Sequence, residues 1–470
     1  MTTAHVGVAS ASVPMPPTPA ARGTARPQPP QPPPAGAPKV VKRPGVIGGI
    51  HVTQIVLWQV AIALVLASLG RHIAVMIAAG AVAALILIFT ALRFRGRWVY
   101  QWIGLRLSYL SRPRALVTGA HADRRSEFLA FVHPGATADS VETDEYEVGV
   151  LDHVAGAAAI IEIATESSLV VEQPVALPSP ATLLPPHDPD APPVTVQLLV
   201  QTVPAPTLTA VSLSAASSYY ALTNGSVPSQ RRAWLVLQIA HSAGYSSEQI
   251  RQSVGNSVRR LVRRLRQEGV SARPLDREEA LSNLASLAHL NASTIETSAA
   301  VAAAATGATI DIRAVMQRSG ADPRSALTPL AQEHWDVWWS ESVAQATFAV
   351  RRWPNLDSPA GQQLISQITS VPSLATTVSL ATRRVPPPQL EPPSGRDSDK
   401  KPRDSSQLSG HDEVAVELAV RIAAPNPQRL ASVSAALVER ARKCGARLER
   451  LDGQQIRGVA ATLPLGGFLP

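Results

Sequence analysis

The amino-acid sequence predicts an α/β (α+β) cytoplasmic domain anchored by an N-terminal two-helix transmembrane hairpin. Three observations lead to this fold class: two long uncharged apolar stretches lie close together, strand-like and helical patterns alternate after them, and positive charge gathers beside the apolar stretches. Residues 1–122 hold twelve of the 43 Lys and Arg residues and no acidic residue, whereas the remainder holds 31 basic and 35 acidic side chains. The net charge of +8 therefore comes entirely from residues 1–122, so it does not indicate that the whole protein binds nucleic acid.

The first segment, residues 1–49, holds twelve of the 41 prolines and few large apolar side chains. Such a composition cannot bury enough surface to offset the entropy of ordering, so we expect a disordered Pro-rich cytoplasmic tail. The apolar region also begins too far from the N-terminus for a signal peptide.

Residues 50–92 contain the predicted hairpin, with one uncharged stretch at 52–69 and another at 73–92. At about 1.5 Å per residue, each stretch approaches the thickness of a hydrocarbon core, about 30 Å. Lys and Arg precede the first stretch and follow the second, while the three residues between them hold only Arg71. The positive-inside rule therefore predicts a multi-pass protein of the cell (inner) membrane with both termini in the cytoplasm.

A basic and aromatic juxtamembrane collar is predicted at residues 93–114. Interfacial aromatic rings and cations that face anionic lipid explain this mixture, and its position beside a membrane helix argues against a nucleic-acid stripe. The expected partner of the collar is therefore the inner membrane with its anionic lipids, and no nucleic acid. The collar residues are Arg93, Arg95, Arg97, Trp98, Trp102 and Arg106.

The rest of the 470 residues has the composition of ordinary globular domains. We expect an α/β domain at 115–384, a disordered linker at 385–407 and a C-terminal βαβ unit at 408–470. The sequence HWDVWW has helical spacing and predicts a helix packed on the strand that follows, with its Trp residues in the core or, alternatively, at an interface. The predicted strands are Glu145–Leu151, Val194–Val203, Ala233–Ala240, Ala344–Val350 and Val414–Ile422.

One amphipathic helix is predicted between a capping box at Ser246 and a stop at Gly269. Its apolar residues share one face and its arginines occupy the rest. The basic side is a solvated face, a docking face for an acidic partner or the membrane surface, or a nucleic-acid surface, in decreasing order of support. The candidate docking residues are Arg259, Arg260, Arg263 and Arg264.

A second segment resembles the end of this helix. Residues 261–276 align without gaps with residues 437–452, and a strand-like run precedes each of the two helices. We hypothesise that strand, helix, Gly stop and strand occur twice. The alternative is that two ordinary amphipathic helices converged on similar residues.

The sequence contains no recognisable catalytic, cofactor-binding or metal site. The eleven histidines form no HxH, HExxH or HxxxH pair, and neither a phosphate-binding loop nor a GxSxG elbow is present. The single cysteine, Cys444, excludes an intramolecular disulfide and is expected to pack in a helix. We therefore expect no cofactor, no metal and no small-molecule ligand.

The Pro-rich basic N-terminus, the short-loop hairpin, the collar RFRGRWVYQWIGLRLSYLSRPR and the later strand ATFAVRRWP together resemble EccE, a membrane component of actinobacterial type VII (ESX) secretion systems. The resemblance covers about residues 45–355. It implies a soluble α/β domain in the cytoplasm, no established enzymatic activity, and a place beside EccB, EccC and EccD in the inner-membrane complex.

The resemblance therefore implies a non-enzymatic structural component that supports protein export together with EccB, EccC and EccD-like components. The alternative is a membrane-tethered enzyme such as a glycosyltransferase-like protein, because EccE domains have been likened to such folds. Against it, the sequence shows no convincing DxD metal motif apart from Asp188-Pro189-Asp190 in a Pro-rich loop. A third hypothesis is a membrane-anchored nucleic-acid binder.

Overall fold

The computed structural model describes residues 46–47, 50–94, 97–117, 123–163, 179–186, 188, 191–204, 228–290, 329–356, 358–385 and 414–468. The predicted tail, apart from residues 46–47, and the predicted linker, apart from residue 385, lie outside these ranges. Two short strands, β1 (Val46–Ile47) and β2 (Ile50–His51), pair just before the first helix.

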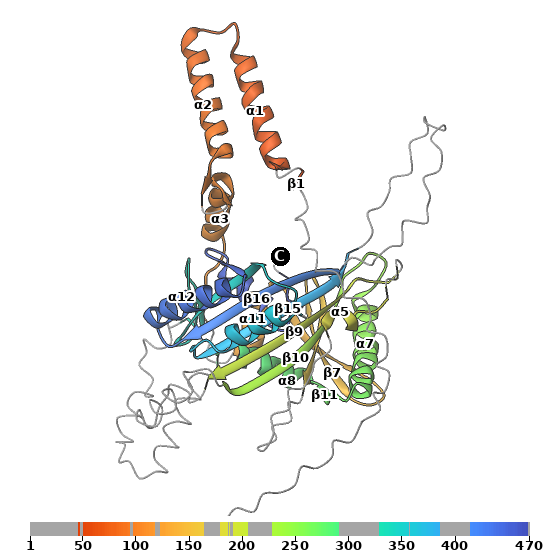
Figure 1. The fold of residues 1–470 in the computed structure, drawn as a ribbon. Helices are drawn as coiled ribbons and strands as arrows, with labels where there is room; N and C mark the ends of the chain where they lie inside the picture. The colour runs from red at the N-terminus through yellow and green to blue at the C-terminus, as the bar shows by residue number, and fades with distance from the viewer. Residues whose placement is uncertain are drawn as a thin grey trace, which may run out of the picture. The chain divides into compact units, whose positions relative to one another are not determined.

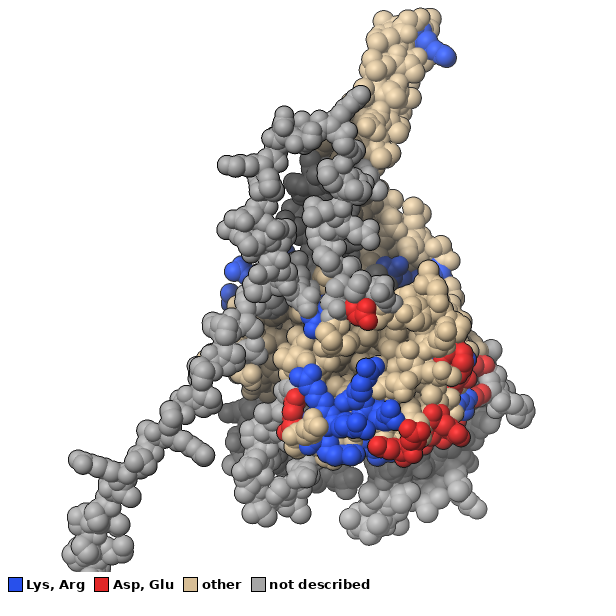
Figure 2. Space-filling model, turned by 90° about the vertical axis from the view of Figure 1, so that its right-hand side faces the viewer, with Lys and Arg blue, Asp and Glu red and all other residues tan. Residues whose placement is uncertain are grey.

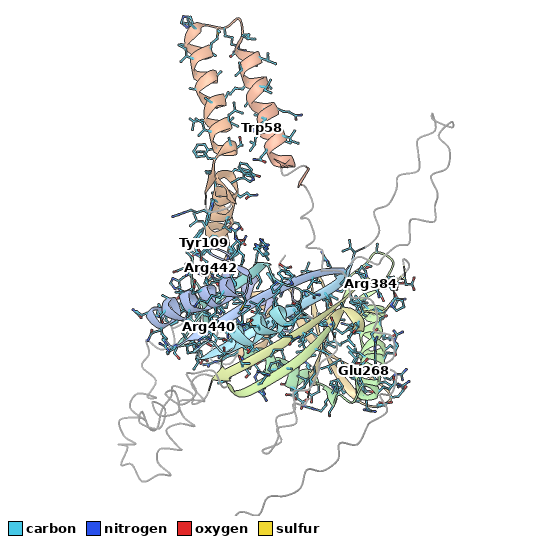
Figure 3. The ribbon with its side chains drawn as sticks, in the orientation of Figure 1. Trp58, Tyr109, Glu268, Arg384, Arg440 and Arg442 are labelled. Atoms are coloured by element: carbon cyan, nitrogen blue, oxygen red, sulfur yellow. The ribbon has the colours of Figure 1, made fainter. Side chains whose placement is uncertain are left out.

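Two apolar helices, α1 (Val52–Ser68) and α2 (Ile73–Ala91), run antiparallel and pack against each other (Figure 1). Small side chains permit the close approach, because Ala61, Ala79 and Ala83 are buried. Near the end of the hairpin opposite the turn, Gln54 Nε2 donates to the Thr90 carbonyl oxygen at 2.9 Å. Trp58, labelled on α1 in Figure 3, donates from Nε1 to Thr90 Oγ1, also at 2.9 Å.

By length and composition, α2 is able to cross a membrane, while the 17-residue α1 is an apolar helix shorter than the usual span. The structure thus contains a hairpin of two apolar helices in which one meets the requirement for a span. Its helices begin and end within a residue of the predicted stretches.

A two-strand hairpin follows α2, formed by β3 (Arg93–Phe94) and β4 (Arg97–Trp98). Helix α3 (Val99–Ser111) comes directly after it. The Val99 amide donates to the Leu92 carbonyl at 3.1 Å, so α3 begins where α2 ends and the Arg-rich hairpin is looped out between them.

The described strands of residues 115–468, here called the sheet domain, form one antiparallel sheet of 13 strands. Its main order is β5-β12-β13-β14-β16-β15-β9-β10-β8-β7-β6, with β11 paired to β8 and β17 to β14. All five predicted strands are confirmed. The strands are β5 (Ala115–Leu116), β6 (Thr137–Glu142), β7 (Glu147–His153), β8 (Gly156–Ile163), β9 (Val194–Pro204), β10 (Pro228–Ala240), β11 (Ala272–Pro274), β12 (Ala331–Glu333), β13 (Trp338–Ser340), β14 (Val343–Arg352), β15 (Ala375–Arg384), β16 (Val414–Ala424) and β17 (Arg447–Arg450).

Helices cover both faces of the sheet (Figure 1). One face packs against α4 (Arg124–Val132), α8 (Arg277–Leu287) and α13 (Gln455–Ala461). The other face packs against α7 (Ser247–Gln267) over one half, and against α11 (Pro359–Thr369) and α12 (Pro427–Lys443) over the other half. The short α5 (Pro180–Leu183) lies beside β9 and β15. Because strand side chains alternate between faces and helices cover both faces, β8 is buried along nearly its whole length. The central strands β9 and β15 are also largely buried, although they hold several Thr, Gln and Ser side chains.

The sheet repeats itself around its centre. Read from each edge toward the centre, one half of the sheet has the order β7-β8-β10-β9 and the other half has the order β13-β14-β16-β15. The two halves meet where β9 pairs with β15. In each half a strand, a helix, a glycine with positive φ and a short strand follow one another: β10, α7, Gly269 and β11 in one, and β16, α12, Gly445 and β17 in the other. The hypothesis that this unit occurs twice is therefore supported by the pairing of β11 with β8 and of β17 with β14.

One expectation holds in part and one is wrong. Residues 408–470 contain β16, α12 and β17 in the predicted βαβ order, but β16 lies between β14 and β15 of the shared sheet. HWDVWW forms no helix: β12 and β13 are a strand pair in which Glu333 lies opposite Trp338. The Trp338 ring is fully buried, as the alternation of a strand requires, and its neighbour Trp339 packs on the opposite core.

Candidate functional site

The candidate functional site is the place where α3 contacts the sheet domain, here called the joint. Its aromatic part is a set of rings around Trp335, which lies between β12 and β13. The rings of Trp335 and Trp102 are stacked with centroids 6.2 Å apart, and Tyr109 meets Trp335 edge-on at 5.2 Å. The guanidinium carbon of Arg106 lies 5.8 Å from the centre of the same ring. The Trp335 ring of the sheet domain thus contacts side chains from three consecutive turns of α3.

The polar part of the joint is an ion pair between Arg112, just after α3, and Glu333 on β12. Arg112 donates from Nε at 3.0 Å and from Nη2 at 2.6 Å to the two oxygens of the Glu333 carboxylate. The Glu333 side chain is 0% exposed. Such a two-point contact fixes direction as well as distance.

The C-terminal part of the chain completes this arrangement. Arg112 Nη2 also donates to the Gly453 carbonyl at 2.8 Å, and the Ile456 amide in the first turn of α13 donates to Glu333 Oε1 at 3.0 Å. A carboxylate at a helix N-terminus is favoured by the helix dipole. Glu333 therefore holds α3, β12 and α13 together at one point.

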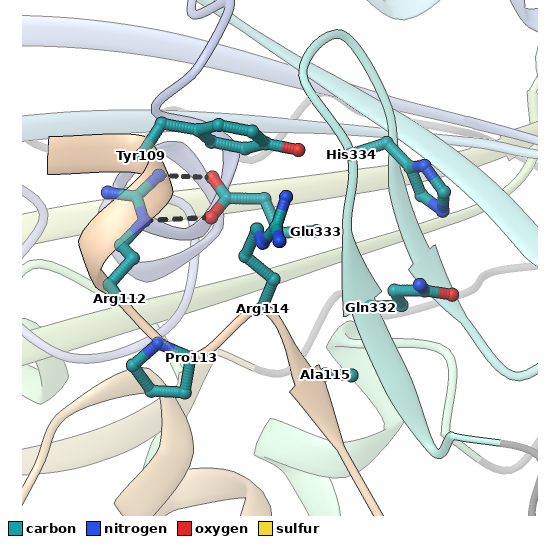
Figure 4. A pocket seen from close by; sticks show the side chains of 8 residues that line it. All are labelled: Tyr109, Arg112, Pro113, Arg114, Ala115, Gln332, Glu333 and His334. Atoms are coloured by element: carbon teal, nitrogen blue, oxygen red, sulfur yellow. Dashed lines mark hydrogen bonds and ion pairs between the residues drawn. The ribbon is translucent and has the colours of Figure 1, made fainter. Parts of the chain in front are cut away.

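A pocket of about 440 Å³ opens beside this ion pair (Figure 4). Arg114 lies above the Tyr109 ring, 5.2 Å from its centre. The two dashed contacts in Figure 4 are those between Arg112 and Glu333. The lining residues are Tyr109, Arg112, Pro113, Arg114, Ala115, Gln332, Glu333 and His334.

The predicted collar residues divide between two structures. Trp102 and Arg106 contact Trp335 and so belong to the joint. The backbone of Arg93 and Arg97 forms the β3–β4 hairpin, Trp98 is the N-cap residue of α3, and Arg95 lies outside the described residues. The predicted collar thus consists of the short β3–β4 hairpin followed by α3, and one side of α3 contacts the sheet domain.

The sequence did not indicate Arg112 or Glu333 as site residues, and for Trp335 in HWDVWW it left the core and an interface as alternatives. Arg112 and Glu333 are 221 positions apart, so no spacing relates them. The sequence did contain one signal for Glu333. At every second position from 329 to 339 the residue is Pro, Ala, Trp or Val except at Glu333, so the carboxylate shares the strand face of apolar side chains.

The predicted docking arginines lie together on the solvent side of α7. Figure 2, which views this side of the molecule, shows Lys and Arg side chains gathered in one group with acidic side chains beside it. Arg259 pairs with Asp144 at 2.7 Å and Arg264 with Glu268 at 3.2 Å. Arg260 bonds Ser257, and Arg263 is exposed without an ion pair to any residue that the structure describes. The apolar side of α7 is buried, which confirms the predicted amphipathic division.

A buried histidine, His153 at the end of β7, and a partly buried one, His133 at the end of α4, form a separate cluster. The rings of His133 and His153 lie 4.6 Å apart, and His153 Nε2 is 3.5 Å from Gln238 Nε2. Burial, together with the neighbouring His133 and His241, lowers the pKa of His153 to about 4, and burial lowers the pKa of His133. Both rings are therefore neutral in the folded protein at neutral pH.

The guanidinium of Arg421 is buried at the C-terminal end of α8. Arg421 on β16 is 2% exposed and donates to the Leu287 carbonyl at 2.8 Å and to Gln345 Oε1 at 3.0 Å. Burial lowers its pKa to about 9, and burial together with Arg421 lowers the pKa of His289 to about 3. The carbonyl dipoles at this helix end offset the charge of the guanidinium.

These buried histidines predict that the folded protein loses stability in mild acid. Because the folded-state pKa of His153 is depressed, its contribution is complete above its unfolded value of about 6.5 and is lost as the pH falls toward 4. Urea unfolding of the wild type should show a free energy that falls between pH 7.5 and pH 5, by at most about 1.4 kcal/mol per pH unit for each such group. His153→Gln should flatten this dependence, whereas the same change at exposed His334 should not. An equal slope in the wild type and His153→Gln would exclude His153 as a cause.

Among the described residues, no group of three or more His, Cys, Asp or Glu side chains could hold a metal ion. Of the Asp188-Pro189-Asp190 sequence, only Asp188 lies within the described ranges. Cys444 is the C-cap residue of α12 and packs partly buried against the core there, as expected for a packed cysteine.

No family model and no curated protein matches the chain.

Proposed function

We propose that this chain is a non-enzymatic structural component of the type VII (ESX) secretion inner-membrane complex and assembles there with EccB, EccC and EccD-like components. In this proposal both α1 and α2 cross the inner membrane, and both termini are cytoplasmic. The proposal rests on the sequence resemblance to EccE and on one structural observation, the joint.

The joint supports a scaffold because it ties the segment after the membrane helix to distant parts of the sheet domain. Glu333 receives Arg112 from the end of α3 and the Ile456 amide from α13. A protein that positions other components from a membrane anchor needs such a fixed connection, since a flexible linker leaves its domain free to rotate.

The looped-out β3–β4 hairpin supports the orientation. In sequence, three arginines fall within the five residues 93–97 after α2, and cations near anionic headgroups each contribute about 1 kcal/mol. The hairpin tip between α1 and α2 holds only Arg71. This asymmetry is the pattern expected when the end of α2 faces the cytoplasm.

The basic side of α7 supplies a candidate surface for acidic partner proteins. Its exposed arginines outnumber the carboxylates that pair with them among the described residues. Oppositely charged patches steer association and select partners.

Affinity purification of the tagged full-length chain from native membranes tests the function. We expect EccB, EccC and EccD homologues to co-purify, and to be reduced by a triple variant of α7, Arg260→Glu, Arg263→Glu and Arg264→Glu. The matched control is Arg442→Glu with Lys443→Glu on α12, which occupies the equivalent place in the other half of the sheet. Recovery of the chain without these homologues would contradict the scaffold function. If the homologues co-purify equally with the α7 variant and the α12 control, the basic side of α7 is not the docking surface, while the scaffold function stands.

A further inference from the structure

Helix α1 presents the side chain of Gln59 on the side that faces away from α2. The residues of α1 that pack toward α2 are Gln54, Ala61 and Ser68, which are buried and recur every seven residues. At about 100° per residue, Gln59 lies roughly 140–160° around the helix from Gln54 and from Ala61. Its side chain is exposed, and no residue that the structure describes forms a hydrogen bond with its amide.

The depth of Gln59 along α1 makes this exposure costly. Gln59 is the eighth of the 17 residues of α1, about 10 Å from one end of the helix and about 13 Å from the other. If α1 crosses the membrane as proposed above, on which this inference rests, the amide lies near the middle of the hydrocarbon core. Hydrocarbon offers neither a donor nor an acceptor, so lipid alone leaves the amide unpaired.

The other glutamine of α1 shows what such an amide requires. Gln54 is buried in the hairpin, and its Nε2 donates to the Thr90 carbonyl oxygen of α2 at 2.9 Å. The same side chain is thus paired where a second helix lies against it, and unpaired on the side without one. Figure 1 shows α2 as the helix that runs beside α1.

A second membrane-spanning helix fits the Gln59 side of α1. The amide both donates and accepts, so it pairs with an amide or a hydroxyl at the same depth, as polar side chains do between membrane helices. Ala63 lies one turn further along the same side and is also exposed. Its small side chain lets the backbone of a second helix approach closely enough for this hydrogen bond.

We propose that the side of α1 formed by Val56, Gln59 and Ala63 binds a membrane-spanning helix of another protein, and that this helix presents an amide or hydroxyl side chain at the depth of Gln59. The unpaired amide selects a polar membrane helix over lipid. The proposed function places other membrane components beside this chain, so the helix is assigned to one of them. The contact adds a surface inside the membrane to the cytoplasmic surface of α7.

Photo-cross-linking of the full-length chain in native membranes tests this contact. A benzophenone amino acid replaces Ala63 or, as the matched control, Ala78, which is exposed on α2 at the same number of residues from the turn between the helices. We expect Ala63 to cross-link to a membrane helix of another protein, with the linked residue within one turn of an Asn, Gln, Ser or Thr when mapped by mass spectrometry. Gln59→Leu should reduce this product about tenfold, because it removes the amide, whereas Gln59→Asn should retain most of it.

Several results would overturn the proposal. These are cross-linking of Ala63 to lipid alone, to a second copy of the chain, or to a helix without such a polar side chain. Equal products at Ala63 and Ala78, or a product that Gln59→Leu leaves unchanged, would also overturn it.

Two observations separate a failure of this contact from a failure of the proposed function. Release of the chain by alkaline carbonate would contradict membrane anchoring itself. A Gln59-dependent product with a protein unrelated to EccB, EccC and EccD would support the contact and contradict the proposed complex.

Discussion

Arg112→Ala is expected to destabilise the protein by about 3–5 kcal/mol, because it leaves the buried carboxylate of Glu333 without its charged partner. The Glu333 side chain is 0% exposed, and among the described contacts only the Ile456 amide still donates to its carboxylate once the guanidinium is gone. Thermal or urea unfolding of the detergent-solubilised full chain measures this loss. The carbonyl of Gly453 also loses a donor in this variant.

Two further variants make the result specific. Arg114→Ala, two residues along and exposed, removes a cation without breaking an ion pair and should change the free energy of unfolding by less than about 1 kcal/mol. The double variant Arg112→Met with Glu333→Leu should recover most of the stability, since an apolar pair replaces the buried ions. A loss below about 1 kcal/mol in Arg112→Ala would mean that the joint does not hold α3 as described.

Trp338→Ala is the second substitution with a large expected effect, about 3–5 kcal/mol of lost stability. Its ring is fully buried against Phe128 at 6.4 Å and Phe131 at 6.0 Å between ring centroids, and its Nε1 donates to Ser340 Oγ at 2.8 Å. The change therefore creates a large cavity under α4 and leaves a hydroxyl without its donor.

The matched control is the neighbouring residue, Trp339→Ala, whose ring is half-buried on the opposite face of the same strand. Its loss should be clearly smaller. Equal losses at both positions would contradict the strand in this segment, because a helix would not separate adjacent rings onto two faces. Unfolding midpoints at matched protein concentration decide between the two results.

The local elements were predictable from the sequence because each depends on its own residues. The strands at 194–203 and 233–240 are apolar runs, and both form long strands in the structure. The capping box at Ser246 and the stop at Gly269 bound α7, since both are backbone requirements that a few side chains satisfy.

The order of the strands was not predictable, because pairing joins segments far apart in the chain. The Pro-rich break near residue 385 indicates a boundary, yet β16 returns across it to lie between β14 and β15. The Pro-rich break shows that β15 ends near residue 385. It does not show where the next strand pairs, which depends on burying both faces of β16 in the sheet.

The joint shows the same limit at the level of side chains. Collar residues such as Trp102 and Arg106 are of the types that suit a lipid headgroup layer, and the same types suit an aromatic partner. Only the fold reveals Trp335 as that partner, because β12 and β5 pair and place the two segments side by side.

The central claim is that α3 is held rigidly on the sheet domain, and a distance measurement in membranes tests it most directly. Spin labels at Ser108 on α3 and at Asp336 in the β12–β13 turn are both exposed and flank the joint. In the full-length Cys444→Ser chain we predict one narrow distribution of label-to-label distances, which broadens in Arg112→Ala and not in Arg114→Ala. A broad distribution in the wild-type chain, unchanged by Arg112→Ala, would contradict the claim.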